Sequence, residues 1–179
     1  MAFNVDEFRS NMLGDGARVN LFQVSMFMPA FLGAAQASQK LTFMAKTAQI
    51  PESNVNHVSL YYFGREVKLA GTQRVFPNLP LTIINDEDFM VRRALESWMD
   101  SINSHSQNVR SPAALSALQY ATDATVTQYG KAGDIIKEYN FIGLFPSNLS
   151  QIDLTWDTDN IEEYTADFVY QYWTSDSTT

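Results

Sequence analysis

Apolar and polar side chains alternate with a period of two over much of this chain, which is the pattern of half-buried antiparallel strands. In the first half, this pattern predicts a strand over residues 20–28, a loop over 29–39 and a second strand over 41–50. Two further runs, 57–63 and 65–70, flank Gly64 and predict a hairpin. A β-branched run predicts one more strand over 79–84.

The last third of the chain shows the same alternation. It predicts strands over 120–129, 135–145, 151–156 and 164–172. In the third of these, Ile152, Leu154 and Trp156 share one face. Strands of this kind typically form an antiparallel sheet with one face on the core. The polar residues 174–179 are predicted to form a flexible tail.

The clearest predicted helix covers residues 85–104. Asn85 is a suitable N-cap, and three acidic residues follow it where negative charge favours the helix dipole. Apolar residues then recur at spacings of three and four: Met90, Val91, Ala94, Leu95, Trp98 and Ile102. This face is typical of a helix that covers a sheet. Ser111-Pro112 opens a shorter predicted helix that ends at Leu118.

Neither a linker nor an internal repeat divides the chain, so residues 1–179 are predicted to form a single domain, mainly β with one covering α-helix. Such a domain is expected to be an antiparallel β-sandwich or a partly open barrel. A chain of this length buries enough surface to fold without disulfides, and it contains no cysteine. An N-terminal arm, 1–16, and a segment over 46–76 are predicted to lie outside the body.

The segment 46–76 contains the predicted hairpin and a cluster of large apolar side chains. The cluster consists of Leu60, Tyr61, Tyr62 and Phe63. Exposed apolar surface of this size is costly in water, so we expect a neighbouring molecule to cover it. These four residues are the candidate contacts with that neighbour.

The formal net charge of −8 is unevenly distributed. Residues 1–110 are neutral, whereas residues 111–179 hold ten acidic and two basic side chains. Proteins that grip nucleic acid need clustered Lys and Arg, so specific nucleic-acid binding is not expected. Two interpretations remain open: an ordinary solvated acidic surface, or a surface that repels a polyanion.

The sequence predicts no catalytic, metal-binding or cofactor-binding site. His57 and His105 are the two histidines, and neither lies in a recognisable motif. There is no G-x-S-x-G elbow and no glycine-rich phosphate loop. The longest apolar run is a few residues, so no membrane insertion is expected, and the acidic N-terminus is not expected to be a secretory signal.

Several short segments resemble the tail tube proteins of contractile-tailed bacteriophages, most closely the large myovirus type. In the first half they are Ala17-Arg-Val-Asn-Leu-Phe-Gln-Val24, Met44-Ala-Lys-Thr-Ala48, Ala70-Gly71 and Ile84-Asn-Asp-Glu87. In the second half they are Gly143-Leu-Phe-Pro-Ser-Asn148, Leu154-Thr-Trp-Asp157 and the closing Tyr172-Trp173. The order and spacing of these segments match the tail tube pattern over residues 17–173. The chain departs from the pattern in the longer stretch 29–39 and in the extension 174–179.

This resemblance implies a structural protein without enzymatic activity or cofactors. The fold implied is the β-sandwich shared by phage tail tubes and the haemolysin-coregulated protein of type VI secretion. Hexameric rings would stack into a hollow tube inside a contractile sheath and conduct DNA into the host. The partners implied are other copies of the chain, the sheath protein, baseplate or initiator proteins, a tube terminator, a tape-measure protein and transiting DNA. The protein would belong to the virion and assemble in the host cytoplasm.

Within such a tube, the acidic excess would suit the wall of a DNA conduit, because basic groups would hold the DNA. Glu138, Asp153 and Asp167 alternate with apolar neighbours and are the candidate lumen-facing residues. A tube subunit of a type VI or other contractile injection system is the alternative function. A small-molecule β-barrel binder and a hydrolase dependent on His57 or His105 are rival classes.

Overall fold

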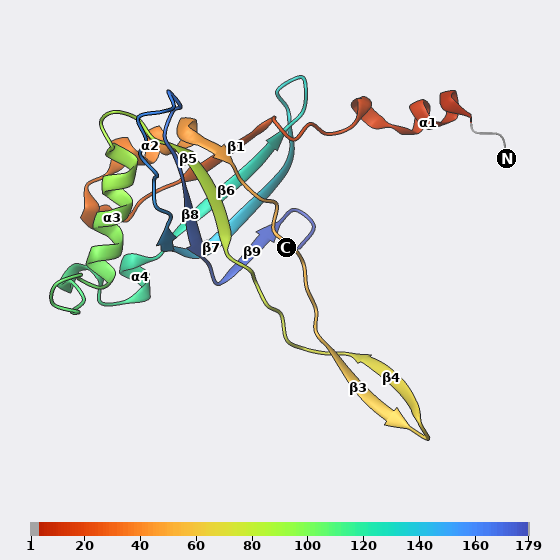
Figure 1. The fold of residues 1–179 in the computed structure, drawn as a ribbon. Helices are drawn as coiled ribbons and strands as arrows, with labels where there is room; N and C mark the ends of the chain where they lie inside the picture. Colours follow the sequence, from red (N-terminus) through yellow and green to blue (C-terminus); the bar gives the residue numbers. More distant parts are fainter. Residues whose placement is uncertain (1–3, 179) are drawn as a thin grey trace.

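The computed structural model describes residues 4–178 (Figure 1). Its α-helices are α1 (Val5–Asn11), α2 (Ala35–Met44), α3 (Met90–Ile102) and α4 (Ala117–Tyr120). Its strands are β1 (Phe22–Met26), β2 (Ala45–Thr47), β3 (His57–Tyr62), β4 (Arg65–Ala70), β5 (Leu79–Ile84), β6 (Thr122–Tyr129), β7 (Ile135–Leu149), β8 (Glu163–Val169) and β9 (Tyr172–Ser175).

The body is an antiparallel sheet folded into two layers that share β7. The strand order is β1-β6-β7-β8-β5-β2, and β9 also pairs with β7. The first part of β7 pairs with β6, and its last residues pair with β8. In Figure 1, β1, β6 and β7 run at an angle across β5 and β8. Antiparallel strands that cross in this way form the predicted sandwich, or partly open barrel.

Gly143 lies where β7 passes from one layer to the other. Its φ is +69°, and its N–H donates to the Asp123 carboxylate at 2.9 Å. A Cβ at this position would lie 2.8 Å from Cγ of Gln171. Both the left-handed backbone and the close approach favour glycine at this bend.

The core joins both layers to helix α3. Val24, Leu81 and Phe141 are buried, and so is the predicted inner face of the helix, Val91, Ala94, Leu95 and Trp98. The Trp98 indole N–H donates to the Tyr120 carbonyl at 2.7 Å, which connects α3 to the last residue of α4, just before β6. The three-to-four spacing therefore predicted the covering face of α3 correctly.

Lys40 connects α2 to the turn before α3. Its ammonium lies 2.6 Å from the Asp86 carboxylate and 2.5 Å from the Asp88 carboxylate. Hydrogen bonds from Lys40 lower the pKa of both carboxyl groups, and the two carboxylates raise the pKa of Lys40. Two of the three acidic residues that were assigned to the helix dipole, Asp86 and Asp88, thus link the turn before α3 to α2.

Tyr164 gives a stability prediction. Its hydroxyl is buried without a hydrogen-bond partner among residues 4–178, and this burial raises its pKa. Because an unsatisfied buried hydroxyl is costly, Tyr164→Phe should raise the free energy of unfolding by about 1 kcal/mol. The control is Tyr129→Phe, which removes a 2.7 Å hydrogen bond to Gln23 and should lower it by about 1 kcal/mol. Urea unfolding of the monomer measures both, and a destabilised Tyr164→Phe would contradict the prediction.

The prediction of a loop over 29–39 and a strand over 41–50 was wrong. Residues 35–44 form helix α2, and only Ala45–Thr47 are extended. Leu41 is buried and Phe43 is exposed because two positions correspond to about 200° around a helix. The hydroxyl of Ser38, one turn before Leu41, accepts a hydrogen bond from the Met28 N–H at 3.0 Å. Contact of α2 with β1 and with Met28, which follows β1, therefore outweighed the local alternation.

Two predicted boundaries and one predicted strand also need correction. Helix α3 begins at Met90 rather than at residue 85, its N-cap is Phe89, and Asn85 instead hydrogen-bonds Glu162. Residues 151–156 form no strand, and Leu154 and Trp156 lie in solvent. The predicted flexible tail 174–179 begins too early, because Thr174 and Ser175 belong to β9 and pair with β7. Residue 179 lies outside the described residues.

The strand predicted over 164–172 is two strands, because the chain leaves the sheet at Tyr170 and Gln171 and returns as β9. The short helix predicted after Ser111 is a 3-10 turn at Pro112–Ala114 followed by α4. Strand β7 continues to Leu149, beyond the predicted end at residue 145. For the two strand predictions, the central residues are correct and the boundary follows the pairing partner. For the predicted helix, the central residues 115 and 116 are not helical.

Candidate functional site

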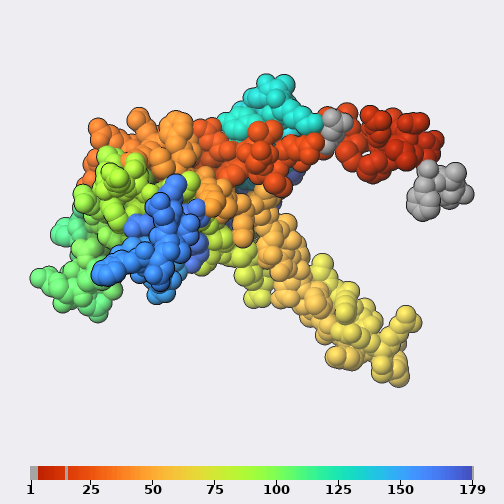
Figure 2. All heavy atoms as spheres, turned by 45° about the horizontal axis from the view of Figure 1, so that its top comes forward, coloured from red at the N-terminus to blue at the C-terminus, as the bar shows by residue number. Residues whose placement is uncertain are grey.

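The hairpin β3–β4 projects away from the body (Figures 1 and 2). Its two strands pair only with each other, in a register that runs from His57 opposite Ala70 to Tyr62 opposite Arg65. At its base, the Gly71 N–H donates to the Asn56 carbonyl at 2.7 Å. A Cβ on Gly71 would lie 2.8 Å from that carbonyl oxygen, so glycine permits this closure. An isolated two-stranded hairpin is at best marginally stable in water, so contacts in an assembly would stabilise it.

The tip of the hairpin is an exposed aromatic turn. Phe63 and Gly64 both have positive φ, +48° and +80°, which is typical of a two-residue type I′ turn. Asn or Gly usually occupies the first of these positions, because a bulky side chain is strained there. Phe63 is nevertheless 93% exposed, and its ring meets the edge of Tyr62 with centroids 4.6 Å apart. A strained and exposed aromatic residue is typical of a site that serves function rather than folding.

The sequence-predicted contact residues Leu60, Tyr61, Tyr62 and Phe63 therefore lie together on this hairpin. All four are exposed in the single chain. Figure 2 shows that the hairpin projects from the body. The predicted projecting segment 46–76 is too long, because Lys46 and Thr47 belong to β2, which pairs with β5, and Phe76 packs against the core. The role of Leu60, Tyr61, Tyr62 and Phe63 as inter-ring contacts stays a prediction.

A second apolar surface lies on the connection between β7 and β8, residues 151–162. We call it the 151–162 loop. Leu154, Trp156 and Ile161 are exposed on it, and Trp156 has full solvent access. Sequence analysis missed this surface because the alternation of Ile152, Leu154 and Trp156 resembled a core-facing strand. The four acidic residues in the same twelve positions were the available signal that this segment is not central in a sheet.

The N-terminal arm is the third projection. Figure 1 shows helix α1 at the end of this arm, away from the body. Asn4 caps the helix, since its side chain accepts from the Asp6 and Glu7 N–H groups, and the Phe8 side chain is exposed. The arm, the hairpin and the 151–162 loop each leave large apolar side chains exposed in the single chain. Surfaces of this kind mark interfaces with other protein molecules.

The structure separates the three candidate lumen acids. Glu138 lies in the β1–β6–β7 layer opposite Thr127, and Asp167 lies in the other layer, where its carboxylate accepts from Asn148 at 3.0 Å. Both point away from the core, because their neighbours Tyr139 and Phe168 pack into it. Asp153 is on the 151–162 loop and accepts from Gln151 at 3.2 Å. The premise that all three alternate within strands is therefore wrong for Asp153.

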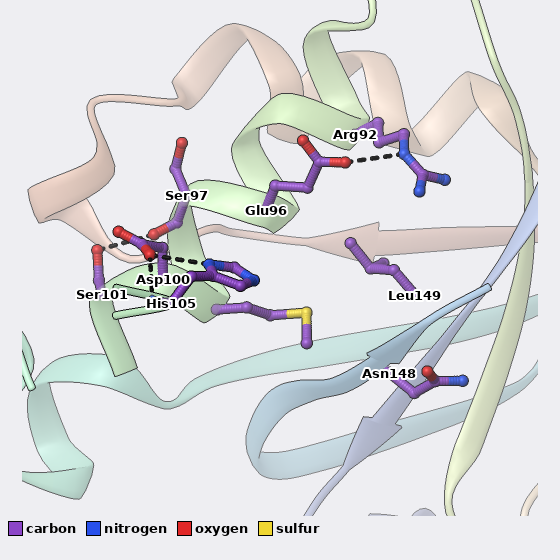
Figure 3. Close-up of a pocket in the computed structure, with 9 residues that line it drawn as sticks. Arg92, Glu96, Ser97, Asp100, Ser101, His105, Asn148 and Leu149 are labelled. Carbon is purple, nitrogen blue, oxygen red and sulfur yellow. Dashed lines mark hydrogen bonds and ion pairs between the residues drawn. The ribbon is translucent and has the colours of Figure 1, made fainter. Parts of the chain in front are cut away.

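A surface depression of about 760 Å³ along helix α3 holds several charged groups (Figure 3). They form two separate pairs: Arg92 with Glu96 at 2.9 Å, and His105 with Asp100 at 3.0 Å. His105 lowers the pKa of Asp100. The Ser101 hydroxyl donates to the Ser97 carbonyl rather than to His105. The depression thus lacks the nucleophile–base contact that acyl transfer needs.

The remaining chemistry is equally sparse. His57 is exposed at the base of the hairpin, whereas His105 follows α3, so the structure does not bring the two histidines together. Among residues 4–178, no group of His, Asp or Glu side chains is arranged to hold a metal ion. No helix in that range is long and apolar enough to cross a bilayer.

A β-sandwich with projecting extensions that expose large apolar side chains is typical of a subunit that binds other protein chains. Comparison with known proteins identifies the class of protein. The phage tail tube protein family model matches residues 17–176, and the chain belongs to that family. The role of the protein is therefore structural, as a component of a phage tail and so of the virion.

Two curated relatives are similar over nearly their full length. The tail tube protein gp19 of Enterobacteria phage T4 is 30% identical over 94% of this chain and 97% of its own. The tail tube protein of Serratia phage KSP90 is 26% identical over 93% of each chain. The resemblance in sequence segments was therefore correct.

Solved structures agree on the fold. A chain of the sheath–tube complex of PVC, an extracellular contractile injection system, aligns with a TM-score of 0.61 over 93% of this chain and 95% of its own. A chain of the tube-terminating cap of the anti-feeding prophage aligns with a TM-score of 0.62 over 89% and 90%. Both TM-scores show a shared fold, and at 14% sequence identity the likeness is one of fold alone.

Proposed function

We propose that this chain forms hexameric rings that stack into the hollow inner tube of a contractile phage tail. The observation that carries the proposal is the 30% identity to a named tail tube protein over nearly both whole chains. The projecting hairpin supports it, since a subunit that must contact the next ring needs a segment that leaves its own body. Edge strands β1 and β2, each paired on one side only, offer backbone groups to neighbours within a ring.

The partners follow from that role. A sheath would surround the tube, baseplate or initiator proteins would start it, and a terminator would close it. A tape-measure protein and then DNA would occupy the lumen without sequence-specific binding, and assembly would take place in the host cytoplasm. The net charge of −8 suits a conduit for DNA, and the protein would have no enzymatic activity.

A tube subunit of a type VI or other contractile injection system is the second candidate. The fold shared with the two injection-system chains favours it, whereas the higher sequence identity favours a phage tail.

Electron microscopy of concentrated, purified protein tests the proposed function. We expect rings and stacked tubes, with a baseplate initiator added if the chain does not nucleate alone. A protein that stays monomeric under all salt conditions, with an initiator present, would exclude the tube function.

The candidate lumen acids give a sharper prediction. Because Glu138 and Asp167 lie on the outer faces of two different layers, only one of them can line a channel bounded by one layer. The chain has no cysteine, so Glu138→Cys, Asp153→Cys and Asp167→Cys each place one thiol in the tube. A cysteine that lines the channel of a capped tube should react with a small maleimide but not with a maleimide coupled to a large polymer. We expect this pattern for residue 138 or for residue 167, but not for both. Reaction of every site with the large reagent would mean that none of the three lines the channel.

A further inference from the structure

The hairpin and the 151–162 loop are complementary in their apolar surface. The hairpin presents Leu60, Tyr61, Tyr62 and Phe63 at and near its tip, and the loop presents Leu154, Trp156 and Ile161. None of these side chains is covered within the single chain. Aromatic residues of this size dominate the energetics of interfaces when they are buried against each other.

The 151–162 loop is held at both of its ends. Where it leaves β7, the Ser150 N–H donates to the Thr165 carbonyl at 2.8 Å, and the Ser150 hydroxyl accepts from the Thr165 N–H at 2.9 Å. Where it enters β8, the Asn85 N–H donates to the Glu162 carbonyl at 2.8 Å, and the Asn85 amide donates to the Glu162 carboxylate at 2.7 Å. Anchored ends reduce the entropy that the loop would lose on binding.

The two surfaces also carry opposite charge. Residues 57–74 hold Arg65, Lys68 and Arg74 against the single acid Glu66, which accepts from the Ser59 hydroxyl. The loop holds four acidic residues and no basic one. Within residues 4–178, neither Arg65 and Lys68 nor Asp157 and Asp159 form an ion pair. Unpaired opposite charges at the rims of two apolar patches favour their association and fix its register.

The two surfaces lie at opposite ends of the molecule. In Figure 1, the hairpin extends to the bottom of the view, and the blue segment that contains the loop reaches the top. Figure 2 agrees, since tilting the top forward brings the blue segment to the front while the hairpin stays below it. A surface and its complement at opposite ends cannot meet within one chain, but they meet when identical subunits stack in the same direction.

We infer that the aromatic tip of the β3–β4 hairpin of one subunit docks on the 151–162 loop of a subunit in the next ring. The inference rests on the proposed tube function and assigns the contact that joins one ring to the next. The occupant of the loop is a second copy of this chain, with Phe63 and Tyr62 against Trp156 and Leu154. Arg65 and Lys68 then face Asp157 and Asp159.

Cross-linking tests the contact directly, because the chain has no cysteine of its own. The test variant carries Glu66→Cys near the hairpin tip and Thr158→Cys on the loop, and Tyr62→Cys with Thr158→Cys tests a neighbouring register. Assembled tubes are treated with a short-spacer bismaleimide and separated on a denaturing gel. We expect a ladder of multimers, since each subunit links to the one above and the one below. The control pairs Glu66→Cys with Ser97→Cys on the outer side of α3, and it should stay monomeric.

Mixing single-cysteine chains separates a head-to-tail contact from a symmetric one. Tubes assembled from equal amounts of Glu66→Cys and Thr158→Cys chains should yield dimers and no higher species. Tubes of either variant alone should yield no dimers.

Charge reversal provides an independent measurement. Arg65→Asp with Lys68→Asp should raise the critical concentration for tube formation at low salt at least tenfold, and so should Asp157→Lys with Asp159→Lys. The four changes together should return it to within about threefold of the unmodified value.

The outcomes distinguish the inference from the function on which it rests. Tubes that give no multimers with either cysteine pair, or charge effects that simply add, would overturn the docking while leaving the tube function intact. Failure of the unmodified chain to form tubes would overturn the tube function and the docking with it.

Discussion

Replacing residues 59–68 by Asn-Gly is expected to abolish tube growth while leaving the folded monomer intact. The change joins Val58 to Leu69, which are directly opposite each other in the hairpin. In an antiparallel ladder, hydrogen-bonded and non-hydrogen-bonded pairs alternate, and Val58–Leu69 is the same kind of pair as Tyr62–Arg65, which closes the natural turn. Asn-Gly suits a two-residue type I′ turn. The segment removed contains all four candidate contact residues and none of the core. Sedimentation and electron microscopy should show rings or monomers and no stacked tubes.

Phe63→Asn is the matched control for this excision. Asn adopts a positive φ more readily than Phe, so the hairpin turn should form at least as well. We expect an unchanged urea midpoint and shorter or fewer tubes, because only the exposed aromatic ring is lost. Tubes of normal length from the excised chain would show that the hairpin does not join the rings.

Trp98→Ala is expected to cause the largest loss of stability of any single substitution discussed. Trp98 is fully buried among core residues of both sheet layers, and its indole N–H satisfies the Tyr120 carbonyl. Truncation of a buried Trp typically costs about 3–5 kcal/mol, which is a large part of the roughly 5–15 kcal/mol that stabilises a domain. Urea unfolding of the monomer should show the loss as a lower midpoint with little change in slope.

Two further substitutions separate the causes of this loss. Trp98→Phe keeps most of the apolar contact but leaves the Tyr120 carbonyl unpaired, so it should cost about 1–3 kcal/mol. Ser97→Ala changes the adjacent, exposed position of α3 and should alter stability by less than about 0.5 kcal/mol. A Trp98→Ala chain within 1 kcal/mol of the unmodified protein would mean that α3 does not anchor the core.

The elements that sequence analysis located correctly share a physical property. The hairpin around Gly64, strands β5, β6 and β8, and the buried face of α3 each have a pattern that agrees with the local backbone preference. In β8, for example, Tyr164, Ala166 and Phe168 are buried and the residues between them are partly exposed. Where local preference and tertiary packing agree, periodicity alone is sufficient.

The errors arose where short patterns suited two structures. Leu41, Phe43 and Ala45 alternate as a strand would, yet Ala37, Ser38 and Leu41 also form one face of a helix, and contact with β1 selects the helix. Residues 151–156 alternate as well, but β8 pairs with the end of β7 and with β5, so no edge remains for another strand there. In both places, the conformation depends on which elements lie beside the segment, and the sequence of the segment itself does not reveal this.

Of the two apolar surfaces in the proposed ring-to-ring contact, sequence analysis identified only the hairpin. Leu60, Tyr61, Tyr62 and Phe63 form a run of large apolar residues between turn signals, so their exposure could be anticipated. Their complement, Leu154 and Trp156, was assigned to the core because alternation does not reveal which surface a strand-like segment meets. Likewise, the parity of Glu138 and Asp167 indicated that both leave the core, but not that they leave it on different layers.

By itself, the sequence determined a mainly β domain with α3 as a covering helix, an acidic excess in its last third, a hairpin around Gly64 and membership of the tail tube family. These depend on composition, on local periodicity and on motifs in fixed order, all of which are properties of the chain read in one dimension. The tertiary structure alone decided that residues 35–44 are helical, that the 151–162 loop is exposed, and which layer carries each acid. Those features depend on which strands pair and on what packs against them, because a short segment takes the conformation that its neighbours in space make most stable.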